Sequence, residues 1–151
     1  MPRDRGFVPV LEKYLPEINP AKIMEWGPGR STQVMLETCP NASIVTVDHK
    51  EKWYKKAAAR FGGYENVEVL LQQTHRKKSK YAVCAYDYAP FDFAFVDGRR
   101  RVECVFVALD TVKPGGIIML HDSDRLQYRR IIDRYINVIE ETNRTLVFTT
   151  K

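Results

Sequence analysis

The stretch AKIMEWGPGRST, residues 21–32, decides the fold class. Its first six residues are mostly apolar and predict a short strand, and Ser31 or Thr32 is a residue type that favours the start of a helix. Gly27 and Gly29 lie between the two elements, where a missing side chain lets the backbone come close to a ligand. The stretch therefore predicts a strand, a glycine loop and a helix whose first N–H groups face a binding site.

Strand and helix patterns alternate through the rest of the chain. We expect strands at residues 21–26, 43–47, 67–71, 91–96 and 117–120, and helices at 31–38, 50–61, 79–86, 101–112 and 126–136. Such alternation implies parallel strands joined by right-handed crossovers. Two short segments, 138–141 and 146–148, predict an antiparallel hairpin at the end of the sheet. The expected fold class is thus α/β, a single domain with one doubly wound and mostly parallel sheet.

The chain has 151 residues, the size of one domain with one core. Residues 1–20 contain four prolines and one short helical stretch, 8–15, so we expect a lead-in segment that packs on the sheet. Residues 21–151 then form the domain itself. The sequence KPGG at 113–116 is expected to end one helix and lead into the next strand.

The composition is that of a globular protein, with 44% hydrophobic residues and both charge signs spread along the chain. No apolar run approaches the ~20 residues that a membrane span needs, so no membrane contact is expected. The first six residues are polar and do not resemble a secretion signal. Three widely separated cysteines disfavour a disulfide framework and are typical of reduced thiols in a cytoplasmic protein.

The formal net charge is +5, with basic runs at residues 76–80, 99–101 and 129–130. Clustered basic side chains attract nucleic acid or an acidic substrate. A solvated surface explains the same runs and is favoured, because the net excess is modest for this length. The sequence leaves both interpretations open.

Ligands of a doubly wound sheet bind beyond the carboxyl ends of the strands. Glu25 ends the first strand, and Thr32 stands where a dinucleotide-binding loop has its third glycine, so a diphosphate ligand is disfavoured. A carboxylate at this place repels phosphate but can hold a cation or an ammonium group. Asp48 follows Gly29 by 19 residues, where an acid accepts the hydroxyls of a ribose, caps the next helix, or does both. His49 would then lie over the nucleoside.

Acidic residues also end the fourth and fifth strands. Asp97 follows the fourth, and His121 and Asp122 follow the fifth. One interpretation is a site for magnesium or manganese made of Asp97, Asp122 and Asp124. A second is His121 as general base, oriented by a carboxylate. A third is that Asp122 and Asp124 only cap the last helix. The base is favoured over the other two.

Five features in this order resemble the class I S-adenosylmethionine-dependent methyltransferases: the loop from Glu25 to Gly29, Asp48, the FDFAFVDG stretch at 91–98, the KPGG stretch at 113–116, and the pair at 121–122. The resemblance covers nearly the whole chain. It implies a Rossmann-like methyltransferase fold with S-adenosylmethionine as the cofactor. It further implies cofactor contacts from Glu25, Gly27, Gly29, Ser31, Thr32, Asp48, His49, Gln73, Thr74 and Asp97.

Within this family the resemblance assigns roles to individual residues. Glu25, Gly27 and Gly29 would border the methionine part, and Asp48 would hold the ribose. Residues 73–74 would lie by the adenine. Asp97 would face the sulfonium and the acceptor.

Two subgroups imply different chemistry. In metal-dependent catechol-type O-methyltransferases an Asp after the fourth strand and an Asp-Asn pair after the fifth hold magnesium. Asp97 and Asp122 match this pattern, but Ser123 stands at the Asn position, so a divalent metal is not favoured. Residues 48–53 and 120–125 are similar to glucuronoxylan 4-O-methyltransferase-like proteins of plants and their small bacterial relatives. That similarity implies a sugar or polysaccharide hydroxyl as acceptor.

We therefore expect O-methylation of a small molecule or sugar hydroxyl, with Asp97, His121 and Asp122 as catalytic residues. A nucleic-acid or protein methyltransferase is the alternative that the basic runs favour and that the lack of an Asn/Asp-Pro-Pro-Tyr motif disfavours. A third alternative is a cofactor-binding module without catalysis, or a site completed by a second copy in a homodimer. We expect the acceptor to be lined by residues 1–20 and 72–90.

Overall fold

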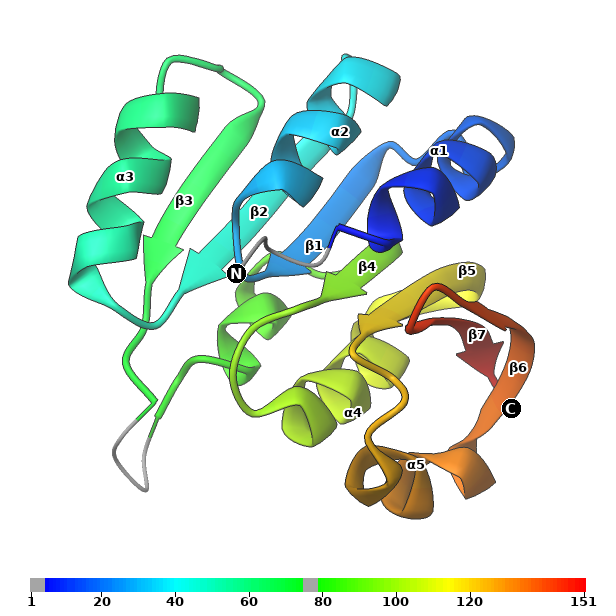
Figure 1. Ribbon diagram of the computed structural model, residues 1–151. Coiled ribbons are helices and arrows are strands. Elements are labelled where there is room, and N and C mark those ends of the chain that lie inside the picture. Colours follow the sequence, from blue (N-terminus) through cyan, green and yellow to red (C-terminus); the bar gives the residue numbers. More distant parts are fainter. Residues whose placement is uncertain (1–4, 75–78) are drawn as a thin grey trace.

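A computed structural model describes residues 5–74 and 79–151 of the chain. Seven strands form one sheet in the order β3-β2-β1-β4-β5-β7-β6 (Figure 1). The strands are β1 (Lys22–Trp26), β2 (Ser43–Asp48), β3 (Val67–Leu71), β4 (Phe91–Val96), β5 (Val112–His121), β6 (Ile136–Thr142) and β7 (Thr145–Thr150). The helices are α1 (Phe7–Ile18), α2 (Arg30–Thr38), α3 (Glu51–Phe61), α4 (Arg101–Thr111) and α5 (Leu126–Ile132), with short 3-10 helices η1 (Val83–Asp87) and η2 (Asp133–Tyr135).

The pairing of the strands confirms the predicted fold class. β1 pairs in parallel with both β2 and β4, so the strand order reverses at β1. The C-terminal strands β6 and β7 form the expected antiparallel hairpin, and β7 adds to the edge of β5. The carboxyl ends of β1 and β4 therefore lie side by side at the switch point, where sheets of this type bind their ligands.

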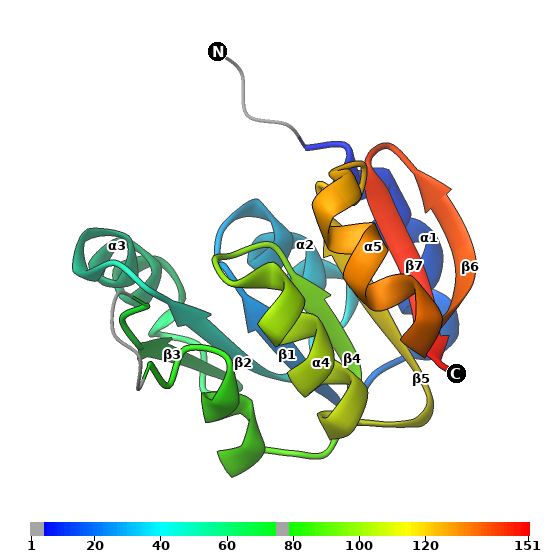
Figure 2. The same ribbon diagram turned by 90° about the horizontal axis from the view of Figure 1, so that it is seen from below.

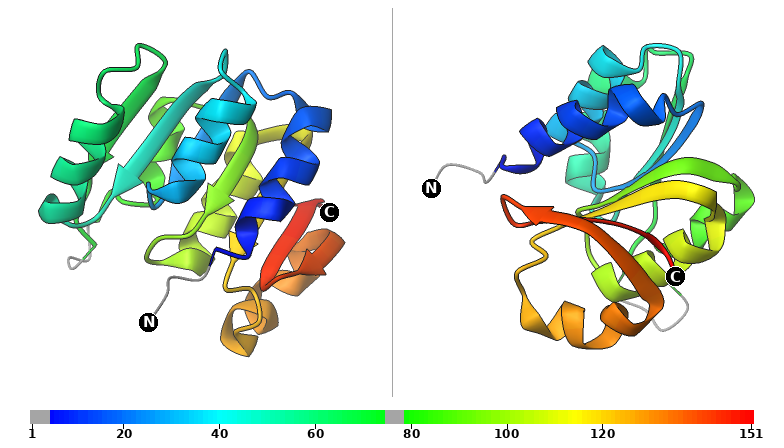
Figure 3. Two further views of the ribbon diagram at one scale, coloured as in Figure 1. Left: turned by 45° about the horizontal axis from the view of Figure 1, so that its top comes forward. Right: turned by 90° about the vertical axis from the view of Figure 1, so that its right-hand side faces the viewer.

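Helices cover both faces of the sheet (Figures 2 and 3). Successive residues of a strand point to opposite faces. In β4, Phe93 and Phe95 pack with α1, α2 and α3, whereas Ala94 and Val96 pack with α4 and α5. A strand buried on both faces reads as a continuous apolar run, which explains the FDFAFV sequence of β4.

The N-terminal segment forms a longer helix than the predicted 8–15. α1 spans 12 residues, Phe7–Ile18, with Pro9 in its first turn and Pro16 near its end. Pro9 is tolerated because the first N–H groups of a helix have no partner within it. Leu11 and Leu15 are fully buried against the sheet, and this packing outweighs the hydrogen bond lost at Pro16.

Three other elements differ from their predicted bounds by more than two residues. β5 begins at Val112, so residues 113–116 lie within the strand instead of between two elements. They form a bulge, because Phe91 pairs with Val112 but Phe93 already pairs with Ile117. The helix expected at 79–86 is the shorter η1, and the helix expected at 126–136 ends at Ile132. None of the described helices is long and apolar enough to cross a membrane.

Candidate active site

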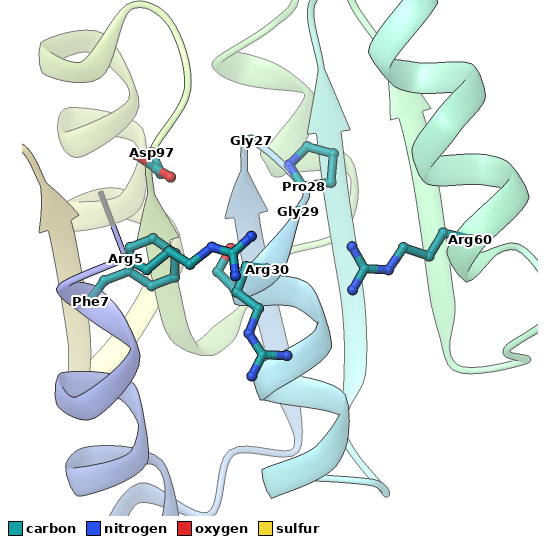
Figure 4. Close-up of a pocket in the computed structure, with 9 residues that line it drawn as sticks. Arg5, Phe7, Gly27, Pro28, Gly29, Arg30, Arg60 and Asp97 are labelled. Atoms are coloured by element: carbon teal, nitrogen blue, oxygen red, sulfur yellow. The ribbon is translucent and has the colours of Figure 1, made fainter. Parts of the chain in front are cut away.

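The loop between β1 and α2 forms the floor of a cavity of about 390 Å³. The lining residues are Arg5, Phe7, Gly27, Pro28, Gly29, Arg30, Ser31, Arg60 and Asp97 (Figure 4). Gly27 has φ +100°, and a Cβ atom there would lie 2.9 Å from the carbonyl oxygen of Asp97. Gly29 differs, because a Cβ atom there would meet nothing within 4 Å. Packing thus explains Gly27, whereas Gly29 leaves open space on the cavity side.

Glu25 lies beneath this loop and is fully buried. Its carboxylate accepts hydrogen bonds from the hydroxyls of Ser31 (2.5 Å), Thr32 (2.5 Å) and Thr46 (2.7 Å). Thr32 Oγ1 in turn accepts the N–H of Gly29 at 3.0 Å. Burial raises the pKa of Glu25 to about 7. Glu25 and Thr32 therefore hold the glycine loop from below with fully buried side chains, whereas Ser31 borders the cavity.

Asp48 ends β2 and is 7% exposed. Its Oδ1 accepts the N–H of Lys50 at 3.0 Å, so it orders the turn before α3. Gly29 and Asp48 also border a second hollow of about 230 Å³, which shares Pro28, Gly29 and Arg60 with the first. The N-cap residue of α3 is Lys50, and no side chain of the described residues caps the helix, so the capping role predicted for Asp48 is wrong. The Asp48 carboxylate bonds the turn before the helix and still borders the second hollow.

His49 carries an unpartnered polar atom. Its Nδ1 lies 3.5 Å from Asp48 Oδ1, and its Nε2 is buried with no hydrogen-bond partner among the described residues. Burial lowers the pKa of His49, which favours the neutral ring. A buried polar atom without a partner costs free energy, and a polar ligand beside Asp48 would remove that cost.

Gln73 and Thr74 follow β3 and border neither hollow. Their carbonyl oxygens accept hydrogen bonds from Ser79 Oγ (2.6 Å) and Arg100 Nη2 (2.6 Å). The structure therefore does not bring these two residues to the cavity, although it places them at the same edge of the sheet as Asp48. The basic residues at 76–78 lie outside the described part of the chain.

The three residues predicted to be catalytic lie together at the ends of β4 and β5. Asp97, His121 and Asp122 each offer a ligand atom, and these atoms lie within 4.8 Å of one another. Asp97 lines the cavity, whereas His121 is 4% exposed and packs edge-on against Phe7, 5.1 Å between ring centroids. Its Nδ1 lies 3.4 Å from Thr145 Oγ1. Phe7 thus lines the cavity and contacts the imidazole, which itself does not line the cavity.

Sequence reasoning missed several side chains of this site. Arg5, Arg30 and Arg60 reach the cavity from the segment before α1, from α2 and from α3 (Figure 4). Arg101 lies beside Asp97 and Asp122, at 3.3 and 3.4 Å. The basic run at 99–101 indicates positive charge at Arg101. A run of basic residues does not show which acid pairs with each of its members.

A sequence profile of the family described as "Methyltransferase domain" matches residues 24–123. The chain belongs to this methyltransferase domain family. The match begins in β1 and ends after β5, so it contains the glycine loop, Asp48, Asp97 and the pair at 121–122. Membership confirms the resemblance drawn from those residues.

Solved structures of other methyltransferases share the fold of this methyltransferase domain. An O-methyltransferase from Bacillus cereus is 17% identical, with a TM-score of 0.76 over 99% of this chain and 83% of that one. A methyltransferase-like protein from Silicibacter pomeroyi is 18% identical, with a TM-score of 0.73 over 100% and 88%. The O-methyltransferase TomG from Streptomyces achromogenes is 19% identical, with a TM-score of 0.70 over 95% and 79%. No curated protein matches the chain significantly, and the glucuronoxylan-type similarity stays a prediction.

Proposed function

We propose that this domain transfers the methyl group of S-adenosylmethionine to a hydroxyl group of a small molecule or sugar. The observation that carries the proposal is the pair at the end of β2, where the buried His49 Nε2 lacks a partner among the described residues, beside the Asp48 carboxylate. Solved neighbours of the same fold support the choice of cofactor. TomG is described in complex with S-adenosylmethionine, and the Bacillus cereus enzyme with S-adenosylhomocysteine.

The residues fit the parts of this cofactor. The Asp48 carboxylate accepts hydrogen bonds from ribose hydroxyls, and His49 Nε2 pairs with a polar group of the nucleoside. Gly27 and Gly29 let the backbone approach the methionine part, and the start of α2 favours its carboxylate. When bound, the cofactor supplies an electrophilic methyl group on a sulfonium. Asp97 lies at the same edge of the sheet and lines the cavity where the acceptor would bind.

Methyl transfer to a hydroxyl requires a group that takes up the hydroxyl proton. We assign this role to His121, because a neutral imidazole nitrogen can accept a proton, whereas the Asp97 carboxylate is ion-paired with the Arg101 guanidinium. Since the imidazole is buried and packs against Phe7, this role requires Phe7 to move when the acceptor binds. Most of the rate enhancement then comes from holding acceptor and methyl group in line.

The charge of the cavity narrows the acceptor class. Arg5, Arg30 and Arg60 line the cavity, and Asp97, the lining carboxylate among the described residues, is paired with Arg101. S-adenosylmethionine itself carries a net positive charge. An acceptor that bears an acidic group would relieve this excess of positive charge, so we propose an anionic hydroxyl compound.

Calorimetry with S-adenosylhomocysteine tests the cofactor assignment. We expect the wild-type domain to bind it and Asp48→Asn to bind about tenfold or more weakly, because a charge-assisted hydrogen bond contributes roughly 1.5–3 kcal/mol. Glu51→Gln is the matched control, because Glu51 begins α3 but is exposed and pairs with the exposed Lys55. Equal affinity in wild-type and Asp48→Asn would contradict the ribose role.

Measurements of turnover test whether His121 is the general base. On an identified acceptor, we expect His121→Ala to lower kcat by roughly 10²–10⁴-fold with little change in the affinity for S-adenosylhomocysteine. The loss should shrink as the pH rises, because more of the acceptor hydroxyl is then ionised without the help of a base. Unchanged turnover in His121→Ala would exclude the imidazole as the base. Cofactor binding without turnover on any acceptor would instead support the non-catalytic alternative.

A further inference from the structure

Arg101 folds back from the start of α4 onto the ends of β4 and β5. Its side chain is only 12% exposed. Nε donates to the carbonyl oxygen of Gly98 at 3.0 Å, Nη1 donates to the carbonyl of His121, and Nη2 lies 3.4 Å from the carbonyl oxygen of Asp97. Three backbone contacts therefore fix the guanidinium in one orientation.

The same guanidinium bridges the two acids that a metal ion would use. Nη2 lies 3.3 Å from Asp97 Oδ1 and 3.4 Å from Asp122 Oδ2. Ligand atoms of Asp97, His121 and Asp122 lie within 4.8 Å of one another, which is compatible with a shared cation. The positive charge between the two carboxylates comes from Arg101.

Further guanidinium groups of the described residues surround these carboxylates. Asp122 also meets Arg144 at 2.9 Å and Arg125 at 3.8 Å, and Arg144 pairs with Asp124 at 3.1 Å. Among residues 5–74 and 79–151, three guanidinium groups thus face three carboxylates in this cluster. A divalent cation would have to displace a guanidinium and leave excess positive charge in a partly buried place, which is unfavourable.

The residue next to Asp122 is engaged elsewhere. Ser123 is fully buried, and its Oγ donates to Glu141 Oε2 at 2.5 Å. The side chain at the position of the expected asparagine ligand is therefore tied to β6. The residues of this cluster do not fit magnesium or manganese, although a structural neighbour, the methyltransferase MycE, is described in complex with magnesium.

We propose that Arg101 takes the place of a divalent cation in this domain. It is a positioning residue: it holds the carboxylates of Asp97 and Asp122 in place beside the acceptor. The proposal rests on the proposed function for its catalytic meaning, since Asp97 is the acid that lines the cavity. Whether Arg101 excludes a metal ion from these carboxylates can be measured without any methyl acceptor.

Titration with Mn²⁺, followed by electron paramagnetic resonance, tests this. We expect wild-type and Arg101→Lys to show no specific site at millimolar Mn²⁺. Arg101→Ala should gain a Mn²⁺ site whose affinity is at least about tenfold higher than that of any Mn²⁺ binding by the wild-type domain. The reason is that Asp97 and Asp122 have lost the positive charge that bridged them. The double variant Arg101→Ala/Asp122→Asn should lose that site. A wild-type Mn²⁺ site that Asp122→Asn abolishes would overturn the proposal, and this arm needs no Arg101 variant to fold.

Arg129→Ala is the matched control. Arg129 also bridges two carboxylates, Asp133 at 2.6 Å and Glu141 at 2.7 Å. We expect this variant to gain no comparable Mn²⁺ site, because within the described part of the chain no third ligand of the His121 kind adjoins those acids. Equal gain in Arg129→Ala and Arg101→Ala would refute a specific role of Arg101, as would a folded Arg101→Ala without a site.

Two further measurements distinguish a failure of the role proposed for Arg101 from a failure of the proposed methyltransferase function. Wild-type turnover should be unchanged by a chelator, and inhibition that Mg²⁺ reverses would contradict the role of Arg101. Calorimetry with S-adenosylhomocysteine on the same samples reports on the cofactor alone. Failure of the wild-type domain to bind it would reject the proposed function and leave the Mn²⁺ result standing.

Discussion

Glu25 belongs to the predicted cofactor loop, and burying its carboxyl group costs free energy. Its carboxyl is fully buried, and the three hydroxyls that donate to it do not fully offset the loss of water. Burial therefore raises its pKa from 4.5 to about 7. The residue expected to border the methionine part is, in the folded chain, the anchor of the loop that carries Gly27 and Gly29.

This raised pKa predicts a dependence of stability on pH. The folded state holds the Glu25 proton more tightly than the unfolded state, so its contribution is complete below about pH 4.5 and is lost as pH rises through about 7. The shift corresponds to about 3 kcal/mol. Glu25→Gln should thus gain stability relative to wild-type between pH 5 and 8, measured by urea unfolding at several pH values. A pH-independent difference between the two proteins would contradict a buried, titrating Glu25.

The connection between β1 and α2 contains two glycines, and a different physical cause favours glycine at each position. Gly27→Ala should destabilise the fold by roughly 1–3 kcal/mol or more, because its positive φ and the nearby Asp97 carbonyl oppose a side chain. Gly29→Ala should leave thermal stability nearly unchanged and weaken binding of S-adenosylhomocysteine, since its Cβ enters open space on the ligand side. Thermal unfolding and calorimetry on both variants check this. A strongly destabilised Gly29→Ala, or unaltered binding, would contradict it.

The helices and strands near this loop were predictable because their signals are local. The apolar run of β4 and the glycines after β1 lie within a few residues of the elements they define. The ends of α1 and β5 were predicted less accurately. The extent of α1 depends on the sheet that buries Leu11 and Leu15, and the start of β5 depends on a bulge against β4. Both depend on residues far away in the sequence.

Across the molecule, arginines of the basic runs at 99–101 and 129–130 form ion pairs with nearby acids. Arg100 pairs with Glu103, Arg101 with Asp97 and Asp122, and Arg129 with Asp133 and Glu141. These acids pair with three of the five arginines in the runs at 99–101 and 129–130. Arg5, Arg30 and Arg60 instead line one cavity from the segment before α1, from α2 and from α3.

Nucleic-acid binding should therefore be weak. We expect a Kd for duplex DNA or for RNA no tighter than the roughly 10⁻⁴–10⁻⁶ M of non-specific contacts at physiological salt. Fluorescence anisotropy at two salt concentrations measures both the affinity and its salt slope. Submicromolar binding with a steep slope would restore the alternative of a nucleic-acid methyltransferase.

The order of residues along the chain is enough to predict the alternation of strands and helices, the glycine loop, and the acids at the ends of β1, β2, β4 and β5. Those features are encoded by neighbouring residues and by their order along the chain. Which charged groups form ion pairs follows from the folded arrangement. It buried Glu25, brought Arg5 and Phe7 to the cavity, and set Arg101 between Asp97 and Asp122. Such contacts join residues that are distant in sequence, and their free energy depends on burial and geometry that no local pattern contains.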